Sequence, residues 1–379
     1  MKIKTVYLFY IFILVNTFFK GIGLDNNSKI YLIGLIIGAI ALGEKLLNDK
    51  YTKKELFFIV SSLLVGIVTF LTTKTPTLLL TCLCLSGMKN VETDDVLKKM
   101  YYVRTVTFFA VITLSLLGII ENEKISMWRN GGVSERYSLG FGHPNTLHLT
   151  FFILVALYIY NRYEKLNVFH YIIIIGLNLI IYHFSVSRTG MIVTMLLLVF
   201  CMISKFRAIN KIILKLPIVI FVSLLFISFA TGLLYGKVGI MDKINDILNG
   251  RVAYSHYYLQ TYGFSLFGNN AKNDANALFD NGYLYMYIQF GIVGFIYLSS
   301  LYLRIFKRII EKIDVKKAIL SICFLIYIFT ESFSPNIFMN IILLFVAETI
   351  FLKKNNNDNC FVSQGELNNE KSKHNSASI

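Results

Sequence analysis

The stretch "YIIIIGLNLIIYHFSVSRTGMIVTMLLLVF", residues 171–200, decides the fold class. Two long apolar runs flank a short polar interruption, and Arg188 stands in that interruption as a residue that stays charged in any environment. Runs of this length fit helices across a bilayer core of roughly 30 Å, where backbone amides must bond within their own segment. The stretch therefore predicts two membrane helices that meet near the membrane surface at Arg188.

The rest of the chain repeats this pattern. Of the 379 residues, 55% are hydrophobic and only 16% are charged, and the mean hydropathy is +0.61. The apolar residues come in blocks rather than in amphipathic stripes, which is typical of membrane spans. We therefore expect an all-α polytopic integral membrane protein with about twelve transmembrane helices. Residues 1–352 are expected to form one membrane domain, and residues 353–379 a polar, disordered cytoplasmic tail.

The predicted spans share an apolar composition and are bounded by polar or basic residues. They lie near residues 5–19, 30–43, 56–73, 77–88, 101–120, 146–161, 169–184, 189–204, 216–235, 283–303, 318–331 and 337–352.

Basic residues give the orientation. Most of the 37 Lys and Arg residues fall in alternate short loops, together with the N-terminus and the C-terminal tail. By the positive-inside rule, both termini are cytoplasmic, and the longer loops 121–145 and 236–282 lie outside, the second of them between spans nine and ten. The membrane surface accounts for the net charge of +15, so no nucleic-acid partner is expected.

The second outer loop predicts a helix that lies along the membrane surface. Isoleucine and leucine recur at helical spacing between Ile240 and Leu248. Gly250 then breaks this helix, and Arg251 opens the next stretch.

Several familiar chemistries are absent from the sequence. The cysteines, histidines and acidic residues show no zinc spacing, and no phosphate-binding glycine loop or Ser-His-Asp signature occurs. We expect neither a metal nor another cofactor.

Five short motifs follow one another in the second half of the chain. They are "RYSLGFGHPN" (136–145), "SRTG" (187–190), "NGR" (249–251), "LFGNN" (266–270) and "DNGYLYMYIQFGIVG" (280–294). This series resembles the O-antigen polymerase and O-antigen ligase superfamily, the Wzy-type polysaccharide polymerases of bacterial envelopes. The resemblance covers residues from Arg136 to about Leu303, and the first third of the chain matches only as generic membrane helices.

The resemblance implies a glycosyltransferase of the bacterial cytoplasmic membrane. Such enzymes move a growing glycan from undecaprenyl pyrophosphate to the sugar of a new lipid-linked repeat unit at the outer face, for capsule, O-antigen or exopolysaccharide. The implied partners are this lipid-linked oligosaccharide, the bilayer, a flippase and a chain-length regulator. Two alternatives stay open: a ligase-like transferase, and a lipid-linked oligosaccharide flippase or another transporter.

The resemblance also implies roles for particular residues. Arg188 matches the Ser-Arg motif and Arg251 the outer-loop arginine, and both are expected to contact the pyrophosphate. Ligases usually carry His-Asn where this chain has Asp280 and Asn281. The missing histidine disfavours the ligase activity and leaves Asp280, or His143 in "GHPN", as the base.

The chemistry supports these roles independently. Negative charge builds on the pyrophosphate as the bond to sugar C1 breaks, and fixed guanidinium groups stabilise it. The acceptor hydroxyl is a weak nucleophile, which a carboxylate or a neutral imidazole assists. The expected catalytic residues are thus Asp280, His143 and Arg251.

Further residues are expected to bind substrate: Arg136, Arg188, Arg251, Asn145, Asn281 and Tyr283. Each has a plainer alternative. Arg188 can mark the membrane interface, Arg136 can pair with Glu135, and Asp280 can cap the tenth span. His143 can order the turn into the sixth span, and Tyr283 can belong to the interfacial aromatic belt.

Overall fold

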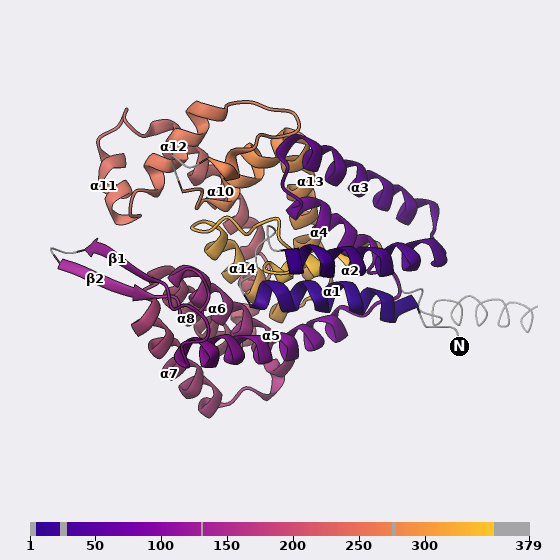
Figure 1. Cartoon of the computed structure of the whole chain (residues 1–379), viewed down its shortest axis with the longest axis horizontal. Coiled ribbons are helices and arrows are strands. Elements are labelled where there is room, and N and C mark those ends of the chain that lie inside the picture. Colours follow the sequence, from indigo (N-terminus) through magenta and orange to yellow (C-terminus); the bar gives the residue numbers. More distant parts are fainter. Residues whose placement is uncertain (1–4, 23–28, 130–131, 275–277, 352–379) are drawn as a thin grey trace, which may run out of the picture.

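The computed structural model describes residues 5–22, 29–129, 132–274 and 278–351, and it is mainly helical over these ranges (Figure 1). The predicted tail, 353–379, lies outside the described residues. The α-helices are α1 (Thr5–Gly21), α2 (Lys29–Asn48), α3 (Lys53–Thr73), α4 (Thr77–Ser86), α5 (Thr93–Leu116), α6 (Pro144–Arg162), α7 (Val168–Ser185), α8 (Arg188–Ile203), α9 (Arg207–Ile213), α10 (Leu216–Leu234), α11 (Ile240–Ile247), α12 (Arg251–Tyr262), α13 (Gly282–Lys312), α14 (Val315–Ile328) and α15 (Ala347–Ile350). Three short 3-10 helices, η1 (Tyr163–Lys165), η2 (Ala271–Asn273) and η3 (Ile341–Val346), complete the helical elements.

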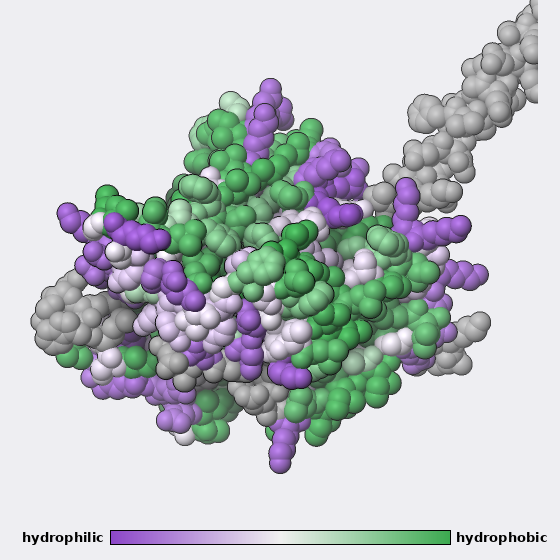
Figure 2. Space-filling model, turned by 90° about the horizontal axis from the view of Figure 1, so that it is seen from above, coloured by the Kyte–Doolittle hydropathy of each residue, from purple (hydrophilic) through white to green (hydrophobic). Residues whose placement is uncertain are grey.

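The prediction of a helical membrane protein is supported by helix length and by the character of the surface. Five helical stretches are long and apolar enough to cross a bilayer: α2, α3, α7, the continuous run from α9 through α10, and α13. Large apolar side chains cover the outer face of α3, where Phe57 is 77% exposed. Figure 2 shows a broad hydrophobic area across one face of the molecule, with polar side chains mainly toward its margins. An apolar surface of this extent suits contact with lipid.

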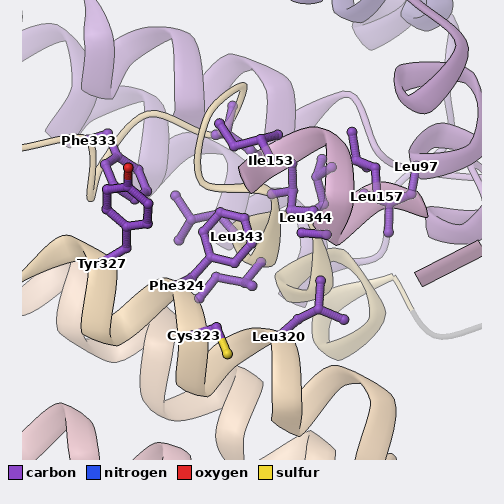
Figure 3. Packing of buried hydrophobic residues seen from close by; sticks show 14 of the residues in the cluster. Leu97, Ile153, Leu157, Leu320, Cys323, Phe324, Tyr327, Phe333, Leu343 and Leu344 are labelled. Carbon is purple, nitrogen blue, oxygen red and sulfur yellow. The ribbon is translucent and has the colours of Figure 1, made fainter. Parts of the chain in front are cut away.

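The core is built around α14. Nearly every residue of α14 from Ala318 to Ile328 is buried, so α14 is surrounded by other helices instead of facing lipid. Phe152 of α6 packs between Phe324 and Tyr327, with ring centroids 4.9 and 5.1 Å away. Figure 3 shows side chains from α5, α6, α14 and the C-terminal segment pointing toward one another, including Leu97, Ile153, Leu157, Leu320, Cys323, Phe333, Leu343 and Leu344.

The twelfth predicted span, 337–352, is not a regular helix. The chain runs without helix from the end of α14 to Asn340 and then forms η3 and the four-residue α15. Residues 341–346 are all buried. Irregular backbone is tolerated at membrane depth where protein encloses it, so an apolar stretch buried in the protein resembles a membrane span in the sequence. The structure therefore does not show twelve spanning helices.

Polar side chains hold this irregular segment, residues 329–340, in place. Thr81 of α4 donates its hydroxyl to the carbonyl of Pro335, and Tyr302 of α13 donates to the carbonyl of Ser334 at 2.9 Å. Arg104, which the sequence placed inside a span, is fully buried and donates from Nη2 to the carbonyl of Phe338 at 2.8 Å. These bonds satisfy carbonyls that the broken helix leaves open, which explains polar residues within apolar helices.

The basic loops gather at one end of the bundle. Lys45 at the end of α2 donates to the carbonyl of Lys89, and Lys89 pairs with Glu55 at the start of α3. Lys316, which opens α14, lies 3.9 Å from the ring centroid of Tyr160 near the end of α6. Loops that the sequence assigned to one side of the membrane therefore lie together. We call this the basic end.

The two long loops lie at the opposite end and contain structure of their own. Strands β1 (Lys124–Arg129) and β2 (Gly132–Tyr137) pair as an antiparallel hairpin that the sequence analysis did not predict. A helix is present where one was predicted, as α11, and α12 begins at Arg251 as expected. The position of α11 along a membrane surface stays a prediction. Gly250 joins the two helices with φ at 83°, in the left-handed region that favours glycine.

Candidate functional site

Residues from five different elements meet at the end opposite the basic loops. Arg136 comes from β2, Asn145 from the first turn of α6, and Arg251 from the first turn of α12. Asp280 precedes α13, and Glu331 lies in the irregular segment after α14. We call these five residues the polar cluster.

The polar cluster is a continuous chain of contacts. Arg136 Nη2 donates to Asn145 Oδ1, and Asn145 Nδ2 donates to Glu331 Oε1 at 3.0 Å. Arg251 Nη2 lies 3.5 Å from the same Glu331 oxygen, and Arg251 Nε lies 3.3 Å from Asp280 Oδ2. Glu331 therefore connects the half that carries Arg136 with the half that carries Arg251.

Both arginines are held in place by the fold. Arg136 is only 5% exposed, and its Nε donates to the carbonyl of Ser185 at the end of α7 at 2.8 Å. The side chain of Arg251 is 16% exposed. Asn245 of α11 accepts from the amide of Ala253, which fixes the first turn of α12 and therefore the place of Arg251.

Glu331 is the residue whose ionisation the site alters most. Burial raises its pKa to about 8, and the nearby Asp280 carboxylate acts in the same direction. Arg251, the hydrogen bond from Asn145 and Arg136 oppose that rise. This rise favours the protonated, neutral form of Glu331. The cluster then carries two arginine charges against one carboxylate, which favours an anionic ligand.

His143 lies beside the cluster as the N-cap of α6. Its Nδ1 accepts a hydrogen bond from the amide of Asn145 at 3.1 Å. His143 therefore orders the turn into α6, which is the structural role that the sequence also allowed. Its ring is solvent-accessible, yet protein atoms around it displace part of its hydration. This desolvation lowers the pKa of His143, the Arg136 charge lowers it further, and Asp280 opposes both effects.

The structure places Asn281 and Tyr283 in supporting positions. Asn281 caps α13 by accepting from the amides of Tyr283 and Leu284, and its Nδ2 donates to Ser228 at 3.0 Å. The cap is thus Asn281 and not Asp280. Tyr283 is fully buried, and its hydroxyl donates to the carbonyl of Leu325 at 3.0 Å. In this arrangement both side chains are occupied within the protein.

Arg188 opens α8, as the sequence indicated, and its residue is exposed. It follows closely after Ser185, whose carbonyl binds Arg136, so it lies near the cluster. No hydrogen bond or ion pair joins Arg188 to Arg251 or to the carboxylates within the described ranges. The structure therefore brings Arg136 and Arg251 into one network and leaves Arg188 at its side.

Sequence reasoning missed Glu331. Glu331 is the last residue of the predicted apolar span 318–331, and no motif in the sequence includes it. The available signal was an acidic residue within an apolar stretch near a membrane surface, which is a candidate functional residue by default. Its link to Arg251 could not be foreseen, because it depends on how the irregular segment folds.

Comparisons with known proteins give no assignment: no family model matches the chain, and no curated protein or solved structure matches it either.

Proposed function

We propose that this protein is a bacterial membrane glycosyltransferase that polymerises lipid-linked oligosaccharide repeat units. It transfers the growing glycan from undecaprenyl pyrophosphate to a sugar hydroxyl of a new repeat unit at the outer face of the cytoplasmic membrane. The reaction needs no metal, because arginines take the charge of the leaving pyrophosphate.

The single observation that carries this proposal is the meeting of three separate motifs in the polar cluster. "RYSLGFGHPN" supplies Arg136 and Asn145, "NGR" supplies Arg251, and "DNGYLYMYIQFGIVG" begins with Asp280. These motifs are separated in the sequence by more than 100 and by about 30 residues, yet their side chains meet in one network. A shared site at the end opposite the basic loops supports one reaction centre on the outer side.

The arginines suit the leaving group. Planar guanidinium groups bind phosphate oxygens through two parallel hydrogen bonds, and they keep their charge in a site of low polarity. Arg136 and Arg251 are already held in place by Ser185, Asp280 and Glu331, so little rearrangement is needed as charge develops. In this proposal Arg188, which is exposed at the start of α8, contacts the outer phosphate.

Glu331 is the base in this proposal, in place of Asp280 or His143. Its raised pKa makes its carboxylate a stronger base than an ordinary glutamate. The acceptor oxygen attacks sugar C1, the bond from C1 to the pyrophosphate oxygen breaks with its electrons leaving on phosphate, and the hydroxyl proton passes to Glu331. Asp280 acts as a positioning residue for Arg251.

The test is turnover by the purified full-length protein. Lipid-linked repeat units are extracted from host cells that lack this protein, and products are separated by chain length on a gel. The proposal expects a ladder of longer glycans and release of undecaprenyl pyrophosphate. The contrary result is that repeat units stay unlinked but cross the membrane of vesicles that contain the protein. This result would identify a transporter and refute the proposed glycosyltransferase activity.

A further inference from the structure

A large cavity opens at the basic end, far from the polar cluster. It has a volume of about 830 Å³ and lies between the start of α3, the second half of α13 and α15. Arg304 of α13 lines it and follows Gly291, where a φ of 68° interrupts the helix that begins at Gly282 beside the polar cluster. The cavity and the polar cluster therefore lie at opposite ends of α13.

The rim of this cavity is positively charged. Lys53, Lys54 and Arg304 line it, all three are exposed, and none of them forms an ion pair within the described ranges. The acidic residue among the lining side chains is Glu55, which pairs with Lys89 and also accepts from the amide of Thr52 at 2.7 Å. Its charge is therefore already neutralised, and the three cations attract an anion.

The wall of the cavity is apolar and continues into the lipid-facing surface. Phe57, Phe58, Leu301 and Ile350 line it. Phe57 is 77% exposed on the same helix face as Val60 and Leu64, which are also exposed. A chain of hydrocarbon that begins beside Arg304 can therefore run along α3 into the bilayer without crossing a polar surface.

We propose that this cavity binds an anionic phospholipid of the leaflet at the basic end. The phosphate lies among Lys53, Lys54 and Arg304, and an acyl chain lies against Phe57 and Leu301. Basic pockets between membrane helices favour anionic headgroups, and the size is in the range of ligand pockets. The proposal depends on the protein being embedded in a membrane and is independent of the glycosyltransferase reaction.

The test compares lipids on the purified full-length protein in detergent, by native mass spectrometry and by thermal unfolding. Phosphatidylglycerol is expected to bind and raise the unfolding temperature, and phosphatidylcholine to do neither at the same concentration. Replacing the three cations together (Lys53→Gln, Lys54→Gln, Arg304→Gln) should weaken phosphatidylglycerol binding about tenfold or more. A matched control removes three exposed cations elsewhere at the basic end: Arg207→Gln, Lys211→Gln and Lys215→Gln.

Three results would overturn the proposal. They are equal binding of the two lipids, equal loss in the control variant, and a thermal shift with inorganic phosphate as large as that with phosphatidylglycerol. Ser300→Phe narrows the cavity without changing its charge. It provides a second test of lipid binding in this cavity if the triple variant does not fold. This variant should also lose phosphatidylglycerol binding, and unchanged binding would contradict the cavity as the site.

Discussion

The two ends of the bundle use charge in different ways. At the basic end, lysines pair with nearby carboxylates, as Lys317 does with Glu348 at 2.7 Å and with Asp314 at 3.3 Å, or stay exposed. At the opposite end, Arg251 is shared between Asp280 and Glu331, and Glu331 is shared between Arg251 and Asn145. The first arrangement suits a membrane surface, where only the sign of the charge matters. The second fixes charges in defined directions, which a reaction centre requires.

This contrast also separates lysine from arginine. A lysine ammonium is a point charge on a flexible stem, whereas a guanidinium group presents a rigid, planar set of donors. The polar cluster contains arginine as its basic residue, and exchanging Arg for Lys should therefore matter there and not at the basic end. The polymerisation assay measures this difference.

Glu331→Gln should have the largest effect. Glutamine keeps the shape and a hydrogen bond to Asn145 but cannot accept the acceptor's proton, so the rate should fall by roughly 10²–10⁴-fold. In the wild type, kcat/KM should rise with pH through about 8, because the raised pKa keeps Glu331 protonated below that pH. The variant should lack this rise. Glu348→Gln at the basic end is the matched control, and an equal loss there would remove the distinction between the ends.

Arg251→Lys should cost about 2–4 kcal/mol of transition-state stabilisation, or two to three decades in rate. Lysine keeps the charge but loses the planar group that spans Asp280 and Glu331. Arg207→Lys is the control, because Arg207 is exposed and also opens a helix, α9, at the basic end. Similar rates for the two variants, at equal expression, would show that Arg251 supplies charge alone.

Arg188→Lys should reduce the rate about tenfold, less than Arg251→Lys, because Arg188 is exposed and outside the hydrogen-bonded cluster. The loss should appear mainly as a higher KM for the lipid-linked donor. An unchanged KM and rate would leave Arg188 as a marker of the membrane interface.

Tyr283→Phe should change the rate by less than about twofold. Its hydroxyl bonds to the carbonyl of Leu325 inside the core, so its removal should lower stability by about 1 kcal/mol. Thermal unfolding measures that loss. A severe fall in rate without a change in stability would return Tyr283 to the substrate-binding residues.

Much of the architecture could be predicted from hydropathy. Helix character around α1–α3, α7 and α13 follows from apolar runs. The contacts of Lys45, Lys89 and Lys316 agree with the grouping of basic loops that the positive-inside rule predicts, and the side of the membrane on which they lie stays a prediction. The break after α14 could not be predicted. Apolar residues at 337–352 fit a lipid-facing helix and a protein-enclosed segment equally well, and the choice depends on partners such as Thr81, Arg104 and Tyr302.

The polar cluster also has a part that the sequence predicts and a part that it does not. Arg136, Asn145, Arg251 and Asp280 were found because each lies in a polar stretch beside a span. Their contacts run through Glu331, which lies on the irregular segment and was therefore missed. The capping role of Asn281 and the burial of Tyr283 depend on how α13 packs, which sequence position alone does not specify.

The proposed reaction requires that the polar cluster faces outward and that the basic end faces the cytoplasm. The most direct measurement labels single exposed cysteines in intact cells with a membrane-impermeant maleimide, using full-length protein with Cys360 replaced by serine. Lys243→Cys on α11 should be labelled in intact cells, and Arg207→Cys on α9 only after the membrane is opened. The reverse pattern would place both arginines of the cluster on the cytoplasmic side and contradict the account.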